Sequence, residues 1–126
     1  MKFLVVDDSP TMRRIVINAL KTFGYTDVVQ AGDGQQGLEQ LEAHDDVEFV
    51  ITDWNMPVMT GLEFTQAIRG NDKFKHLPIL MVTTRGLKSD IIAALKARVN
   101  NYVVKPFTPP VLKEKLDAVL ATLKKK

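Results

Sequence analysis

Five residues that could bind a cation or phosphoryl oxygens each stand at the end of an apolar run in this sequence. They are Asp7, Asp8, Asp53, Thr83 and Lys105. Carboxylates are the usual ligands of hard cations such as Mg²⁺, and a hydroxyl or an ammonium can contact the oxygens of a transferred phosphoryl group. The residue types therefore indicate metal-assisted phosphoryl chemistry, provided that the fold brings these positions together.

Each of these residues also has an ordinary explanation when it is taken alone. A pair such as Asp7 and Asp8 after a strand is commonly a solvated loop or a helix cap. Solvation gives no reason, however, for three carboxylates, a hydroxyl and an ammonium to collect at the ends of strands in one sheet. The whole set therefore favours a functional site.

Three aspartates in one site would repel one another, which implies a bound cation. The chain has no cysteine, and oxygen ligands completed by water and a phosphate suit Mg²⁺. A carboxylate such as Asp53, placed beside Mg²⁺ and the Lys105 ammonium, is a competent nucleophile toward phosphorus. The predicted product is an aspartyl phosphate.

The apolar runs before these residues have the composition of buried strands. They are rich in β-branched and large apolar side chains, which is typical of strands covered on both faces. The predicted strands are residues 3–6, 49–52, 79–82 and 102–104, with a weaker one at 28–31.

Apolar residues recur at helical spacing in two of the segments between and after these runs. The two stripes are Met12, Ile15, Val16, Ala19, Leu20 and Phe23, and Leu112, Leu116, Val119, Leu120 and Leu123. Ser9, Asp33, Thr60 and Thr108 stand where N-caps are expected, and Glu63 follows Thr60 at the spacing of a capping box. Each stripe predicts a helix with one buried face.

Five alternating strands and helices predict an α/β fold, a doubly wound (βα)5 arrangement with a parallel five-stranded sheet. We expect one domain over residues 1–126, because single cores commonly hold about 100 to 150 residues. Ligands of such sheets bind beyond the carboxyl ends of the strands. That edge is where the polar residues stand.

The polar set matches the response-regulator receiver domains in type, order and spacing, and several segments resemble the single-domain chemotaxis members. These segments are residues 3–8, 11–15, 53–57, 80–83 and 102–107. The resemblance covers nearly the whole chain. It implies a flavodoxin-like fold with strand order 2-1-3-4-5.

The resemblance implies that Asp53 accepts a phosphoryl group from a sensor histidine kinase of the chemotaxis type. Asp8 and Asp53 would hold Mg²⁺ together with the backbone carbonyl of Asn55, and Asp7 would act mainly through a bound water. Such a chain is a signalling switch that assists its own phosphorylation and dephosphorylation, not an enzyme.

The resemblance also implies how the signal would leave the site. Thr83 and Lys105 would contact the phosphoryl oxygens, and the bond between Lys105 and Pro106 would be cis. Tyr102 would turn inward when Thr83 moves. Trp54 next to the acceptor is either core filler or a reporter of metal binding. The controlled surface would include Lys88, Ile91, Leu95, Tyr102 and Lys115. Ile91 and Leu95 stand four residues apart, so an ordinary helix core also explains them.

Composition bounds the partners and the compartment. A net charge of +2 that comes partly from Lys124, Lys125 and Lys126 is too diffuse to indicate nucleic acid, and we expect these lysines to form a solvated terminal tail. No apolar run is long enough to span a membrane. We expect a cytoplasmic monomer whose partners are a kinase, the flagellar motor switch protein and a phosphatase. A relay that passes phosphate to a histidine phosphotransfer domain is the alternative.

Three other functions compete with this interpretation. Residues 32–37 read G-x-G-x-x-G, as in dinucleotide sites, but Asp33 would oppose a pyrophosphate and a turn capped by Asp33 is simpler. A Mg²⁺ phosphohydrolase would need a second carboxylate where Asn55 stands. A receiver that signals without phosphate would not need the intact polar set.

Four residues depart from the chemotaxis pattern. Thr84 and Arg85 border the expected phosphoryl site, and Arg98 with Val99 occupies the turn before the last strand. Arg85 could bind a phosphoryl oxygen or shield it from water, or it could be an exposed side chain that pairs with nothing. Thr84 and Arg85 are therefore candidate modulators of the phosphate lifetime.

Overall fold

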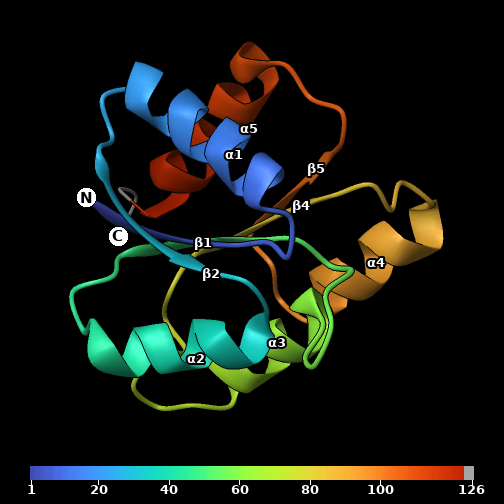
Figure 1. Cartoon of the computed structure of the whole chain (residues 1–126). Coiled ribbons are helices and arrows are strands. Elements are labelled where there is room, and N and C mark those ends of the chain that lie inside the picture. Colours follow the sequence, from blue (N-terminus) through green and yellow to red (C-terminus); the bar gives the residue numbers. More distant parts are fainter. Residues whose placement is uncertain (124–126) are drawn as a thin grey trace.

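Strands and helices alternate five times along the computed structural model, which describes residues 1–123 (Figure 1). The strands are β1 (Lys2–Val6), β2 (Asp27–Ala31), β3 (Phe49–Thr52), β4 (Ile79–Thr83) and β5 (Asn101–Val104). The helices are α1 (Pro10–Thr22), α2 (Gly34–Ala43), α3 (Gly61–Arg69), α4 (Lys88–Lys96) and α5 (Pro109–Leu123). The predicted strands are confirmed to within one residue at each end. The expectation of a solvated tail at residues 124–126 lies outside the described residues.

The five strands form one parallel sheet in the order β2-β1-β3-β4-β5. Helices α1 and α5 cover one face, and α2, α3 and α4 cover the other (Figure 1). In the register of the sheet, Val6 of β1 pairs with Thr52 of β3, and Thr52 pairs with Met81 of β4. The residues that follow β1 and β3 therefore emerge next to each other at the carboxyl edge.

Alternate side chains of each strand enter two separate cores. Phe3 and Val5 of β1 pack on the side of α1 and α5, whereas Leu4 and Val6 pack on the side of α2 and α3. All four are at most 1% exposed. Fully burying an apolar side chain of this size stabilises the fold by about 1.5 to 3 kcal/mol. These two cores fix the strand ends on which the site is built.

The predicted helix starts are built as the sequence indicates. The Ser9 hydroxyl accepts the Met12 N–H, and the Asp33 carboxylate accepts the Gln36 N–H at 2.8 Å. Thr60 and Glu63 form both hydrogen bonds of a capping box. Helix α5 begins one residue after Thr108, whose carbonyl accepts the Leu112 N–H.

The stripe predicted for α1 is only partly buried. Val16, Ala19 and Leu20 lie in the core, but Ile15 is 45% exposed. The expectation that Ile15 is buried was wrong, because it lines an open groove with Phe107 beside the start of α5 instead of facing the sheet. In α5, Leu112, Leu116 and Val119 are buried as expected.

Two glycines of the G-x-G-x-x-G segment allow close packing of helices. Asp33 is the N-cap of α2, and Gly34 and Gly37 lie inside that helix. A Cβ on Gly37 would approach the ring of Phe64 to 2.8 Å, and one on Gly34 would approach the side chain of Met59 to 2.7 Å. The segment therefore brings α2 close to α3 and its preceding loop, which explains Gly34 and Gly37 without a nucleotide.

Candidate functional site

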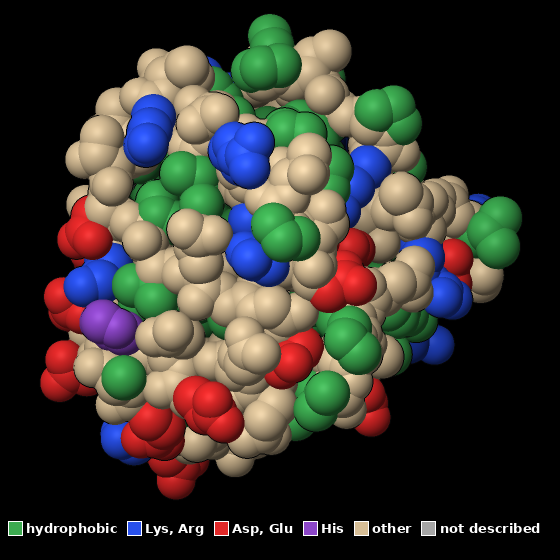
Figure 2. Space-filling view, viewed as in Figure 1, with side chains coloured by type: hydrophobic (Ala, Val, Ile, Leu, Met, Phe, Trp, Pro, Cys, Tyr) green, Lys and Arg blue, Asp and Glu red, His purple; other side chains and the backbone are tan. Residues whose placement is uncertain are grey.

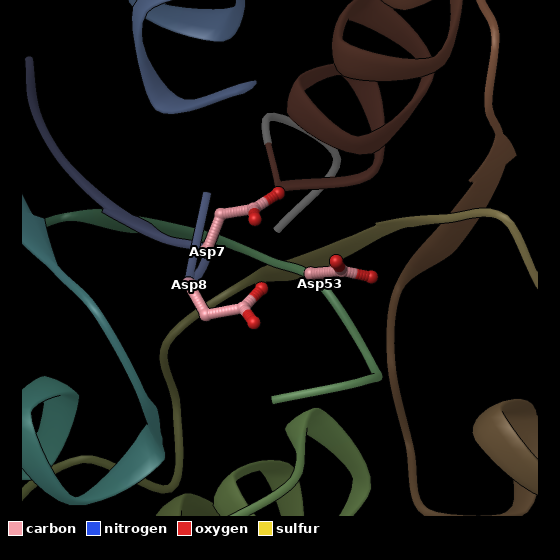
Figure 3. Close-up of side chains that lie close together, drawn as sticks. All are labelled: Asp7, Asp8 and Asp53. Atoms are coloured by element: carbon pink, nitrogen blue, oxygen red, sulfur yellow. The ribbon is translucent and has the colours of Figure 1, made fainter. Parts of the chain in front are cut away.

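Asp7, Asp8 and Asp53 form an acidic cluster at the carboxyl edge of the sheet (Figure 3). Asp7 and Asp8 follow β1 and Asp53 follows β3, and one carboxylate oxygen of each lies within 4.8 Å of the others. Asp7 and Asp53 are buried, whereas Asp8 is exposed. Three carboxylates with one side open to solvent are a donor set that fits a hard divalent cation.

Lys105, which follows β5, supplies a positive charge to this cluster. Its Nζ lies 2.8 Å from Oδ2 of Asp7 and 3.2 Å from Oδ2 of Asp53. The three side chains are all buried, so water screens these ion pairs only weakly. The bond between Lys105 and Pro106 is cis, as the resemblance implied.

Backbone amides orient the two buried carboxylates. The Ser9 N–H donates to Oδ1 of Asp7 at 2.9 Å, and the Trp54 N–H donates to Oδ1 of Asp53 at 2.6 Å. Burial raises the pKa of Asp7, although the hydrogen bonds from Lys105 and Ser9 work in the opposite direction. Ionised Asp7 is therefore costly in the folded protein unless a cation accompanies it.

Gly61 at the start of α3 allows the backbone to approach Asp53. Its N–H donates to the carbonyl of Trp54 at 2.8 Å, and a Cβ at this position would lie 1.8 Å from the carbonyl oxygen of Asp53. No side chain fits in that space. The sequence analysis did not identify Gly61, and its only signal was a glycine directly after the Thr60 cap.

Asn55, whose carbonyl the resemblance assigns to the metal, is exposed in the loop after β3. This loop turns tightly, because the Met59 N–H donates to the Pro57 carbonyl at 2.7 Å. Val58 between them has φ of 68°, a left-handed conformation that is uncommon for a β-branched residue. The strained turn fixes the course of the loop beside Asp53.

Thr83 ends β4 and is fully buried. Its hydroxyl accepts the Arg85 N–H at 3.4 Å, and the carbonyl of Arg85 accepts the hydroxyl of Tyr102. Tyr102 is buried against the core, and burial raises the pKa of its phenol to about 12. The phenol therefore stays protonated at neutral pH and keeps donating. Thr83 and Tyr102 are thus joined through the backbone of Arg85.

The side chain of Arg85 lies over the ring of Trp54 and has polar partners on two segments. The explanation as an exposed side chain that pairs with nothing was wrong. Trp54 is 8% exposed beneath the guanidinium. Thr84, the other candidate modulator, is exposed and lines a groove with Met12, Ile15, Lys105, Pro106 and Phe107.

Comparison with known proteins places this geometry in a family. The sequence model of the response regulator receiver domain matches residues 3–117. The chemotaxis protein CheY1 of Helicobacter pylori is 57% identical over 122 residues, which is 97% of this chain and 98% of that protein. A CheY homolog of Campylobacter jejuni is 56% identical over 97% of this chain and 94% of its own length.

The chain belongs to the response regulator receiver family.

Solved receiver structures agree with this assignment. The chemotaxis response regulator CheY4 of Vibrio cholerae superposes with a TM-score of 0.85 at 37% sequence identity, over 94% of this chain and 97% of that one. The flavodoxin-like fold expected from the resemblance is confirmed. As a receiver domain the chain is a signalling switch, and its acidic cluster corresponds to the pocket in which this family binds a divalent cation.

The residues expected to carry the receiver's signal differ in how deeply they are buried. Ile91 is half-buried and packs against the core, so the ordinary explanation as a core residue of α4 holds for it. Leu95, one turn later, is 50% exposed, and that explanation is wrong for Leu95. Lys88 is exposed and Lys115 of α5 is half-buried.

The turn before β5 contains a second left-handed residue. Arg98 has φ of 72°, and its carbonyl accepts two hydrogen bonds from the guanidinium of Arg69. That guanidinium also donates to the carbonyls of Lys75 and Leu77, so it joins the loops before β4 and β5. Arg98 departs from the chemotaxis pattern, but the turn still forms. It does so with an arginine at a position where glycine would be unstrained. Val99 after it is buried.

Within the described residues, no helix is both long and apolar enough to cross a membrane.

Proposed function

We propose that the chain is a single receiver domain that accepts a phosphoryl group on Asp53 from a histidine kinase and acts in chemotaxis. The observation that supports this proposal best is the placement of Asp7, Asp8 and Lys105 around Asp53 at one edge of the sheet. The similarity to chemotaxis proteins over nearly the full chain supports the pathway, with the flagellar motor switch as the target.

The proposed cation is Mg²⁺, held by Asp8, the Asp53 side chain and the Asn55 carbonyl, with Asp7 acting through water. Bound there, the ion would neutralise the oxygens of the incoming phosphoryl group. The Trp54 amide holds Oδ1 of Asp53 and the Lys105 ammonium contacts Oδ2, so the carboxylate is oriented before the reaction. Asp53 attacks the phosphorus, and the bond to the donor breaks while the leaving group keeps the electron pair.

Lys105 and Thr83 have separate parts in this proposal. The Lys105 ammonium already contacts Oδ2 of Asp53. After phosphorylation it would contact the negatively charged phosphoryl oxygens instead. The Thr83 hydroxyl would turn toward the phosphoryl group and disturb the contacts that join it to Tyr102 through Arg85. The domain in this way assists its own phosphorylation and transmits the conformational change from Thr83 to Tyr102.

Charge on the surface is consistent with protein partners. On the face shown in Figure 2, acidic and basic side chains are interspersed, and that face offers no uniformly basic surface of the kind that binds nucleic acid.

The test is phosphotransfer followed by partner binding. A purified chemotaxis kinase should transfer its phosphoryl group to the wild type but not to Asp53→Asn, and only the phosphorylated wild type should bind a motor switch protein tightly. Rapid onward transfer to a histidine phosphotransfer domain, without binding to the motor protein, would establish the relay role instead. No transfer to Asp53 would refute the proposal.

A further inference from the structure

The Arg85 side chain connects the loop that follows Asp53 to helix α4. Its guanidinium carbon lies 4.5 Å from the centroid of the Trp54 ring, and Nη1 donates to Oδ1 of Asn55 at 3.3 Å. Nη2 donates to Oδ1 of Asp90 at 3.0 Å, in the first turn of α4. Trp54 and Asn55 are the two residues after Asp53, so one guanidinium spans from the phosphorylation site to α4.

Two features of this arrangement indicate that it can change. Nε of Arg85 is buried and has no hydrogen-bond acceptor among the described residues, so one charged donor is unused. The side chain of Asp90 is only 14% exposed, and it forms an ion pair with Arg85. A largely buried carboxylate that loses its counter-ion is destabilised where it stands. Movement of Arg85 would therefore force the first turn of α4 to rearrange.

We propose that Arg85 and Asp90 form a latch that opens on phosphorylation, because the phosphoryl group and Asp90 compete for the guanidinium. The proposal rests on the function proposed above. A phosphoryl group adds about 1.5 to 2 negative charges at neutral pH, next to the residues that the guanidinium contacts. Arginine binds phosphate oxygens through paired, charge-assisted hydrogen bonds. Asp90 is then left without its partner.

The latch would act together with the backbone of the same residue. The N–H of Arg85 contacts Thr83, and its carbonyl accepts the Tyr102 hydroxyl. A shift of Arg85 toward the phosphoryl group would therefore displace both of these contacts and release α4 from the loop after β3. Asp90 is in this sense a positioning residue, which acts on the phosphoryl site through Arg85.

Four variants test the latch: Asp90→Asn, Arg85→Gln, the double variant and Asp72→Asn. Asp72→Asn is the matched control, since this substitution removes the same charge from an exposed aspartate that pairs with Lys75. Each protein is loaded with acetyl phosphate and Mg²⁺, the donor is removed, and the loss of phosphate is followed by intact mass. We expect Asp90→Asn to keep its phosphate about two- to fivefold longer, the range for a partly exposed ion pair.

The other variants separate competition from a merely structural role. Arg85→Gln should lose phosphate faster than wild type, and the double variant should match Arg85→Gln, because Asp90 acts only through Arg85. The emission of Trp54, the single tryptophan, gives a second readout. Asp90→Asn without phosphate should already show part of the emission change that phosphorylation causes in the wild type.

Each remaining outcome overturns the latch. If the wild type takes up no phosphate, the proposed function fails and the latch fails with it. If all variants are phosphorylated but Asp90→Asn behaves as Asp72→Asn does, the latch alone is refuted. An Asp90 effect that persists undiminished in the double variant would also refute it, because that effect could not pass through Arg85.

Discussion

Removal of the Asp8 carboxylate tests the cation site without disturbing the fold. Asp8 is exposed, whereas Asp7 and Asp53 are buried and paired with Lys105. We therefore expect Asp8→Asn to leave the stability of the metal-free protein unchanged or slightly raised, because one like charge is removed from the cluster. The same variant should lose most of the stabilisation that Mg²⁺ gives to the wild type.

The size of the Mg²⁺ effect follows from linkage. At 100 times its dissociation constant, an ion that binds only the folded state adds about 2.7 kcal/mol of stability. An unfolding entropy of about 2.1 cal/mol/K per residue amounts to about 265 cal/mol/K over the 126 residues. The wild type should therefore melt about 10 °C higher in saturating Mg²⁺ than in EDTA.

Thermal melts followed by circular dichroism, at matched ionic strength, measure this shift. Asp72→Asn is the control for the loss of one carboxylate far from the cluster, and it should keep the full shift in Tm. A Tm of the wild type that does not respond to Mg²⁺ would refute the cation site. An equal shift in Asp8→Asn would refute the part assigned to Asp8.

Three further changes have expected outcomes. Lys105→Ala should leave Asp53 phosphorylatable but should weaken the partner binding that phosphorylation induces, and equally tight binding of phosphorylated variant and wild type would contradict this division. The pKa of Tyr102 is raised to about 12 in the folded protein. The protonated phenol therefore contributes fully to the free energy of unfolding below pH 10, and this contribution is lost as the pH rises toward 12. Tyr102→Phe should remove this loss of stability, which amounts to at most about 3 kcal/mol. Urea titrations at several pH values across this range measure it, and an equal loss in wild type and variant would contradict the assignment to Tyr102. Arg98→Gly should raise the free energy of unfolding by about 1 kcal/mol, because glycine is unstrained at φ of 72°. A stability that falls in this variant would show that the arginine side chain contributes more than the strain costs.

The fold was predictable because its signals are local. Runs such as that at β3 are apolar throughout, and caps such as Ser9 and the pair Thr60 and Glu63 mark the helix starts by short-range hydrogen bonds. Parallel strands place their carboxyl ends at one edge, so the order of the elements puts Asp7, Asp53 and Lys105 at the same edge of the sheet. Their contact depends also on the strand order, which the resemblance supplied, and on the long Lys105 side chain, because β4 lies between β3 and β5.

The remaining features depend on contacts that the sequence does not specify. Arg85 has a long side chain with many rotamers. Contacts with Trp54 and Asp90, which lie on different segments, determine which rotamer it adopts. Ile15 belongs to the apolar stripe of α1, but that stripe is wider than the face that meets the sheet. Gly61 is required by a backbone approach of Asp53 that only the tertiary structure reveals.

The central claim is that Asp53 is the phosphorylated residue and that the acidic cluster makes the reaction depend on a divalent cation. Intact mass spectrometry after incubation with acetyl phosphate tests both parts together. The wild type should gain the mass of one phosphoryl group in Mg²⁺ and none in EDTA, and Asp53→Asn should gain none in either. A mass gain in Asp53→Asn equal to that of the wild type, or a gain unaffected by EDTA, would contradict the claim.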